Sequence, residues 1–110
     1  MKNFITYVLL RQEYLETDTV TEPCETGWAS EAIFFIQIQS QNQDDYTIQA
    51  NAQISVDGIH WVNHEALPLL IESDGYYCIK LKEFGGWLRL SIHSTTKDTL
   101  VATVQLALKG

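Results

Sequence analysis

A chain of 110 residues is long enough for one domain and short for two. Its hydrophobic content of 45% excludes a disordered chain, and its net charge of −7 argues against nucleic acid or an anionic membrane surface as a partner, since both bind basic faces. No apolar stretch approaches the roughly 20 residues that span a bilayer. We therefore expect one domain over residues 1–110 that binds neither nucleic acid nor membranes.

The N-terminal segment has a lysine followed by an apolar run, as signal peptides do. This run contains Thr6 and Tyr7, stops at Arg11 and leads to no small-residue cleavage site. The segment is therefore predicted to be a first strand over residues 3–14, and the protein is expected to be made in the cytoplasm without a signal peptide.

The next segment, residues 15–31, is polar and acidic and is broken by Pro23 and Gly27. It is predicted to be a loop, and loops of this length in compact domains are often binding or assembly elements. Trp28 is its one aromatic residue. Two interpretations of Trp28 stay open: it anchors a partner, or it fills the space between two sheets at the end of the domain.

The rest of the chain alternates between apolar and polar residues with a period of two and shows no helical period. The pattern predicts strands over residues 32–40, 46–56, 59–63, 69–71, 76–82, 87–94 and 99–109. Turns at intervals of about ten residues are typical of an antiparallel sandwich. The predicted fold is therefore an all-β antiparallel sandwich, jelly-roll or Ig-like, of about seven to eight strands. The residues predicted to face its core are Phe34, Ile36, Ile38, Tyr46, Ile48, Ala50, Ala52, Ile54, Val56, Leu100, Ala102, Val104, Leu106 and Leu108.

Asp57-Gly58 lies between two alternating segments, which is a strong signal for a hairpin with a type I′ turn. Ser55 precedes this turn, and Trp61 is predicted to close over the core after it. The stretch Ser55-Val56-Asp57-Gly58-Ile59-His60-Trp61 resembles a Ser-x-Asp-Gly-x-x-Trp hairpin of small β-sandwich modules in phage virions and related bacterial proteins. Phe84-Gly85-Gly86-Trp87 and the final Lys109-Gly110 extend the resemblance over residues 46–110. It implies a structural role in covering, joining or oligomerising, and a place in a virion.

Motifs that indicate metal binding or catalysis are few. The best candidate ligands for a metal ion are His60, His64 and Glu65. His93, the third histidine, lies far along the chain. In an extended segment the first two histidines would lie about 13 Å apart, too far to share one ion. No Gly-x-Ser-x-Gly motif is present. We therefore expect no metal, no cofactor, no catalytic residue and no enzymatic activity; a minor alternative is an enzyme that uses loop glutamates or histidines. Cys24 and Cys78 are expected to be two free thiols.

Two side chains on strand 32–40 point away from its core face. Ile33 and Phe35 are apolar where a water-facing sheet should be polar, so either the loop or another subunit is expected to cover them. We predict a non-catalytic assembly module that forms a homo-oligomer and joins a larger assembly, with Trp28, Ile33 and Phe35 as its interface. The alternative is a ligand- or carbohydrate-binding module in which Trp28, Tyr76 or Tyr77 offers a stacking face.

Overall fold

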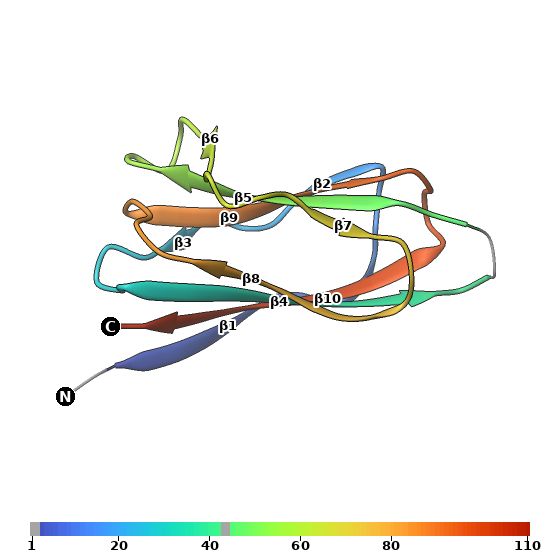
Figure 1. The fold of residues 1–110 in the computed structure, drawn as a ribbon, viewed down its shortest axis with the longest axis horizontal. Helices are drawn as coiled ribbons and strands as arrows, with labels where there is room; N and C mark the ends of the chain where they lie inside the picture. Colours follow the sequence, from blue (N-terminus) through green and yellow to red (C-terminus); the bar gives the residue numbers. More distant parts are fainter. Residues whose placement is uncertain (1–2, 43–44) are drawn as a thin grey trace.

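The computed structural model describes residues 3–42 and 45–110. Over these residues the chain forms ten strands in two facing layers, and none of its segments is a helix that could cross a membrane (Figure 1). The strands are β1 (Phe4–Tyr14), β2 (Asp18–Val20), β3 (Cys24–Glu25), β4 (Glu31–Ser40), β5 (Ile48–Ser55), β6 (Val62–Asn63), β7 (Leu69–Ile71), β8 (Gly75–Leu81), β9 (Trp87–Ser94) and β10 (Leu100–Lys109). The predicted turn at 41–45 includes residues 43–44, which lie outside the described part of the chain.

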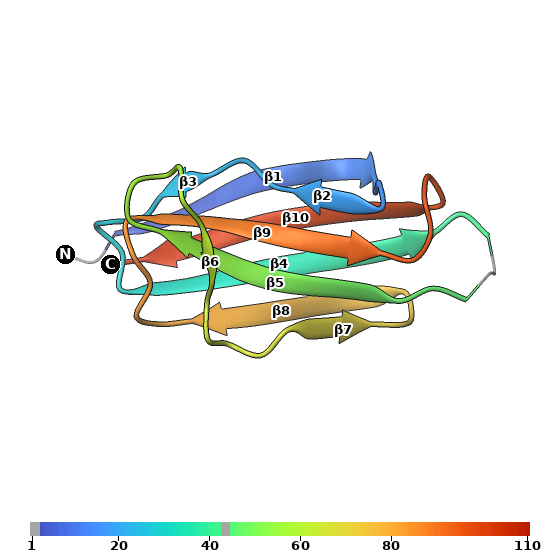
Figure 2. The ribbon, with the colours of Figure 1, turned by 90° about the horizontal axis from the view of Figure 1, so that it is seen from above.

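The two layers are antiparallel sheets with a regular order of strands. One is a four-stranded sheet in the order β1-β10-β4-β8. In the six-stranded sheet β9 pairs with β5, the short β2 and β3 pair with the free edge of β9, and the short β6 and β7 pair with the free edge of β5. With β2–β3 and β6–β7 each counted as one interrupted strand, eight strands remain, in the order of a jelly roll (Figure 2).

The core lies between the sheets and follows from the alternation of the sequence. Phe34, Ile36 and Ile38 of β4 are buried, as predicted, and the alternate residues of β5 and β10 join them. Leu88, Leu90 and Ile92 of β9 complete the opposite wall. The prediction of an all-β sandwich is confirmed. Val56 is the exception among the predicted core residues, since it is 92% exposed at the end of β5.

Two local predictions are wrong. Residues 15–31 are not a continuous loop, because β2 and β3 add to the edge of β9, where Thr21 Oγ1 also accepts a hydrogen bond from the Leu90 N–H. The connection after β5 is not a two-residue turn either. The pairing stops at Ile54 and Val62, and Gly58 has a positive φ of 78° whereas Asp57 does not. A type I′ turn needs positive φ at both residues.

Asp74 holds together the end of the sandwich far from the termini. Its carboxylate accepts hydrogen bonds from the Ser40 N–H at 2.9 Å and from the Tyr46 hydroxyl at 2.6 Å. The Ser40 N–H first and the tyrosine hydroxyl second lower the pKa of Asp74. Burial, followed by the bond to Asp74, raises the pKa of Tyr46.

Candidate functional site: the outer face of the four-stranded sheet

The side of the four-stranded sheet that points away from the core is called the outer face here. Its central row runs across all four strands, because Val8 lies opposite Gln105, Gln105 opposite Phe35, and Phe35 opposite Cys78. Residues directly opposite on antiparallel strands share a face. The neighbouring row contains Thr6, Ala107, Ile33 and Lys80. The outer face therefore brings together the two predicted interface residues Ile33 and Phe35.

Apolar side chains of this face are exposed. Phe35 is 44% exposed in the middle of the sheet, Phe4 is 67% exposed at one end, and Tyr76 of β8 is 82% exposed. The hydroxyl of Tyr76 accepts a hydrogen bond from Gln37 Nε2. A sheet that faces only water would carry polar side chains at such central positions.

The six-stranded sheet shows the contrast within the same molecule. Its outward side chains on the two long strands are polar throughout their central rows: Gln49, Asn51 and Gln53 on β5 lie opposite His93, Ser91 and Arg89 on β9. The two faces of this sandwich therefore differ in chemistry, and the four-stranded sheet presents the side that favours contact with another apolar surface.

A groove of about 730 Å³ opens at the end of the outer face, near the two chain ends. Its apolar surface includes Phe4, Ile33 and Ala107. Around these lie three lysines and three glutamates, which are Lys80, Lys82, Lys109, Glu31, Glu65 and Glu83. An apolar centre with charges of both signs around it matches the anatomy of a protein–protein interface.

His64 fixes one wall of this groove. Its Nε2 bonds to the Lys82 carbonyl at 2.8 Å, so this nitrogen carries the proton, while its Nδ1 accepts the Ala66 N–H at 3.0 Å. Both ring nitrogens are thus engaged in holding the β6–β7 connection against the end of β8. Glu65 lines the groove beside it.

The rings of the other two histidines each contact a nearby aspartate carboxylate. His60 Nδ1 lies 2.8 Å from Asp57 Oδ2, and His93 Nδ1 lies 2.8 Å from Asp18 Oδ1. Within residues 3–42 and 45–110 no three metal-ligating side chains gather at one point.

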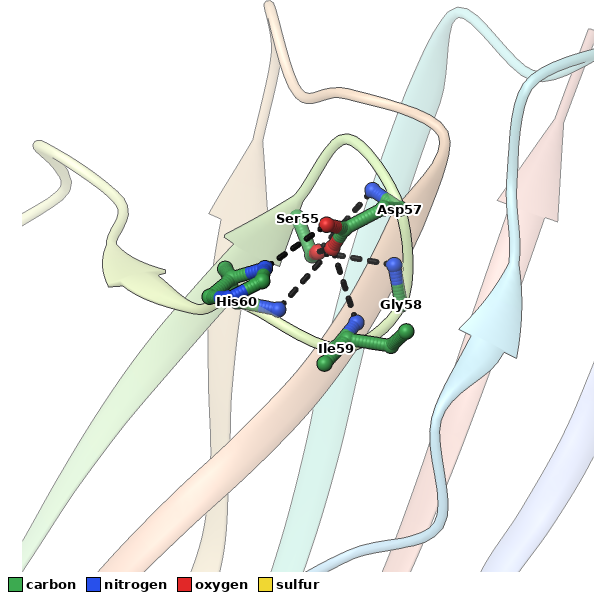
Figure 3. Close-up of polar contacts among 5 residues, drawn as sticks. All are labelled: Ser55, Asp57, Gly58, Ile59 and His60. Carbon is green, nitrogen blue, oxygen red and sulfur yellow. Dashed lines mark hydrogen bonds and ion pairs between the residues drawn. The ribbon is translucent and has the colours of Figure 1, made fainter.

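Residues 55–60 form a loop that is ordered by two side chains (Figure 3). Ser55 Oγ accepts the Gly58 N–H at 2.8 Å and the Asp57 N–H at 3.2 Å, and donates to Asp57 Oδ1. Asp57 Oδ1 also accepts the N–H groups of Ile59 and His60. The His60 N–H first, then the His60 ring, hold the pKa of Asp57 well below its usual range. These bonds show that the residues of the Ser-x-Asp-Gly sequence stabilise the loop itself.

Trp61 does not close over the core as predicted. The guanidinium carbon of Arg89 lies 4.3 Å from the centre of its ring, and Arg89 points outward between the buried Leu88 and Leu90. Arg89 Nε also donates to Gln53 Oε1 at 2.7 Å. Trp61 is half-buried at the polar face of the six-stranded sheet. The loop at 55–60 is longer than a two-residue turn, so Trp61 lies outside the core.

The structure does not gather the three aromatic residues of the predicted ligand site. Trp28 is 36% exposed and packs near Gly110 at the end of β10, so it neither fills the core nor belongs to the central rows of the outer face. Tyr76 and Tyr77 follow each other in β8 and so point to opposite sides. Tyr77 packs against the core and donates from its hydroxyl to the Ser73 carbonyl.

Sequence reasoning missed the contribution of β1 to the outer face. The segment Phe4-Ile5-Thr6-Tyr7-Val8-Leu9-Leu10 is apolar at nearly every position, so it carries no alternation from which its face could be read. The register with β10 places Phe4 and Val8 on the outer face. A run of residues that is apolar on both faces was the signal that could have pointed to contacts on both sides.

No family model matches the sequence, and no curated protein matches it. Solved structures do share the fold. A chain of the T13 IBDV viral particle is 8% identical with a TM-score of 0.65, over 98% of this chain and 31% of that one. The CBM22-1–GH10 modules of endo-1,4-β-D-xylanase 10B from Clostridium thermocellum, complexed with xylohexaose, are 11% identical with a TM-score of 0.54, over 99% of this chain and 26% of theirs.

A further structure is similar over most of both chains. The C-terminal CBM6 of LamC from Zobellia galactanivorans is 7% identical with a TM-score of 0.51, over 94% of this chain and 98% of that one. The chain thus spans about a quarter to a third of the first two proteins and nearly the whole of the third. Viral particles and carbohydrate-binding modules are both among the proteins that share this fold, and the likeness shows the fold alone.

Proposed function

We propose that this protein is a non-catalytic assembly module whose outer face contacts a second copy of the chain, and that the oligomer is a component of a larger assembly such as a virion. The exposure of Phe35 in the central row of the four-stranded sheet is the observation that carries the proposal. Removing such a side chain from water on both partners favours association.

The outer face supplies most of the area that a stable protein contact needs. Four strands of 7 to 11 residues, about 4.8 Å apart and with a rise of about 3.3 Å per residue, cover on the order of 600 Å². A stable interface buries about 800 Å² on each partner. The groove beside the sheet, with its charged walls, supplies further area at one end. The viral particle with the same fold and the likeness of residues 46–110 to phage modules support this proposal.

Size-exclusion chromatography with light scattering tests it at tens of micromolar protein. The wild type is expected to elute as a discrete oligomer, and Phe35→Glu as a smaller species, because a charge in the central row would be desolvated on association. Leu70→Glu is the matched control, since Leu70 is 58% exposed and lies opposite Gln49 on the outward side of the six-stranded sheet, away from the outer face. A monomeric wild type, or equal effects of the two substitutions, would contradict the proposal.

A second candidate function is carbohydrate binding at the opposite face. The observation that favours it is the row of Asn63, Gln53 and Arg89, which are linked by hydrogen bonds and lie beside Trp61. Amide and guanidinium groups bond to hydroxyls, and an indole ring offers a stacking surface. The modules complexed with xylohexaose give a first ligand to try.

Tryptophan fluorescence distinguishes this candidate. Titration with xylohexaose and a panel of other glycans should change the emission of the wild type, and Arg89→Ala should weaken the response at least tenfold. His93→Ala, in the same sheet but away from Trp61, is the control. An unchanged emission across the whole panel would contradict this candidate.

A further inference from the structure

The outer edge of β1 is open. β1 pairs with β10 on one side and has no neighbouring strand on the other within the described residues (Figure 2). The Asn3 carbonyl accepts the Gly110 N–H at 3.0 Å, so the backbone groups of Asn3 point toward β10. Because these groups alternate along an antiparallel strand, the N–H and C=O groups of Phe4, Thr6 and Val8 point to the open edge.

The other edges of the sandwich are short or carry a charge within the strand. The edges of the six-stranded sheet are the short β2, β3, β6 and β7, of two or three residues each. β8, the opposite edge of the four-stranded sheet, carries Lys80, and just beyond its end the His64 ring occupies the Lys82 carbonyl. Short edge strands and lysines are the usual devices that prevent pairing between edges.

β1 itself is protected only in its second half. Register shifts occur after Val8 and again before Glu13, and Gln12 has a positive φ of 48°. Arg11 and Glu13 add charges there. Phe4–Val8, in contrast, pairs regularly with β10 and contains neither a charge nor a proline. This five-residue segment is a long, unprotected stretch of edge.

The side chains of this segment are exposed on both sides of the sheet. Phe4 and Val8, on the outer face, are 67% and 42% exposed, while Ile5 and Tyr7, which point to the other side, are 40% and 39% exposed. A partner resting on the outer face would cover only the first pair. A strand added at the edge would contact both pairs, because its own side chains alternate between the same two sides.

We propose that β1 pairs antiparallel with β1 of a second copy and joins the two four-stranded sheets into one continuous sheet of eight strands. With Thr6, the middle of the regular segment, on the two-fold axis, Phe4 lies opposite the partner's Val8, and Ile5 opposite the partner's Tyr7. The segment is thus complementary to itself, as an isologous interface requires. Every open N–H and C=O of Phe4, Thr6 and Val8 gains a partner.

The small area of this contact indicates a weak dimer. With aromatic side chains of about 150–250 Å², the exposed parts of the four side chains amount to on the order of 300–400 Å² per copy. Two copies then bury less than the roughly 1,200 Å² of a standard interface, which is the range of weak complexes. The edge dimer is therefore expected to form at micromolar or higher concentration and to be strengthened by salt, which screens the net charge of −7 on each copy.

Disulfide trapping tests the pairing. In a Cys78→Ser background, Thr6→Cys places two cysteines opposite each other at the axis, where the separation of Cα atoms across an antiparallel pair suits a disulfide. Under mild oxidation at tens of micromolar protein, Thr6→Cys is expected to form a covalent dimer at least tenfold faster than Val56→Cys, an equally uncharged control at a 92% exposed position. Equal rates for the two variants would overturn the inference.

A second variant measures the non-covalent dimer. Thr6→Pro removes an N–H that points to the open edge, not one that bonds to β10, so the fold is expected to persist, as a cooperative melting curve would show. Its dimer constant should weaken at least tenfold in sedimentation equilibrium, and an unchanged constant would overturn the inference.

The inference shares with the proposed function only the requirement that two copies meet, and their failures are distinguishable. Disulfide trapping at residue 6 that persists with Phe35→Glu would place the contact at the edge. Oligomers lost with Phe35→Glu, together with no trapping at residue 6, would place it on the outer face and overturn the inference.

Discussion

Phe35 and Cys78 lie directly opposite each other on β4 and β8, and both side chains are exposed on the outer face. Cys24, in contrast, is buried beside β9 in the other sheet. The two thiols therefore occupy different layers and different environments. Their reactivity reports separately on the outer face and on the core.

We expect one fast and one slow thiol in a reaction with a chromogenic disulfide reagent at pH 8. Cys78 should react at the rate of an exposed thiol, whereas burial, followed by the charge of Glu22, raises the pKa of Cys24 and slows it. The slow thiol should become fast in denaturant. If the outer face is covered in an oligomer, dilution that dissociates the oligomer should accelerate Cys78 and leave Cys24 unchanged. Two equal rates in the native protein would contradict this assignment.

Ser55→Ala is expected to destabilise the fold by about 1–3 kcal/mol. Ser55 is 4% exposed, and its hydroxyl satisfies the Gly58 and Asp57 N–H groups, which lose their acceptor in alanine. Urea unfolding measures the change in the free energy of unfolding. Ser91→Ala is the control, since Ser91 lies half-buried on β9 with no hydrogen bond from its side chain among the described residues. A cost for Ser55→Ala no larger than for Ser91→Ala would show that the loop does not depend on this hydroxyl.

Gly58→Ala tests the backbone of the same loop. Gly58 has a φ of +78°, and an added Cβ would lie 3.2 Å from two ring carbons of Trp87. The left-handed conformation alone costs a non-glycine residue about 1–2 kcal/mol, and the contact with Trp87 adds to it. Gly86→Ala, whose Cβ would meet only the Val56 carbonyl at 3.9 Å, is expected to be close to neutral in thermal melting. The prediction fails if the two glycines tolerate alanine equally.

Acid should weaken the loop through Asp57. Its pKa is lowered in the folded state, so its carboxylate stabilises the fold at pH values above the unfolded pKa of about 3.9. This stabilisation falls as the pH drops below about 4 toward the lower folded pKa. Asp57→Asn should therefore reduce stability at pH 7 and make it less dependent on pH between 5 and 2.

Urea unfolding across this pH range measures the effect. Asp98→Asn is a matched change of charge at a turn residue whose φ of 62° asparagine also tolerates. Parallel curves for Asp57→Asn and the wild type would show that the Asp57 carboxylate is not a source of acid sensitivity. Asp74, whose pKa is also lowered, acts in the same direction and should account for part of the remaining slope.

Most of the long strands could be predicted from the sequence because their signal is local. Side chains alternate across a strand wherever it lies in a sheet, so Phe34, Ile36 and Ile38 had to face one way and Ile33 and Phe35 the other. The burial of β5 and β10 follows from the same rule. The loop at Ser55 was predicted as a turn for the right residues but with the wrong geometry, because the side-chain bonds of Asp57 override the usual two-residue hairpin.

The sequence by itself therefore determined that this protein is an all-β sandwich and which residues of its alternating strands fill the core. Only the tertiary structure decided that β2 and β3 extend a sheet within residues 15–31, that Trp61 lies under Arg89 outside the core, and that β1 ends a sheet with an open edge. The physical reason is that alternation is a property of one strand, whereas edges and pairing depend on residues such as Phe4 and Lys109, which meet only when the chain has folded.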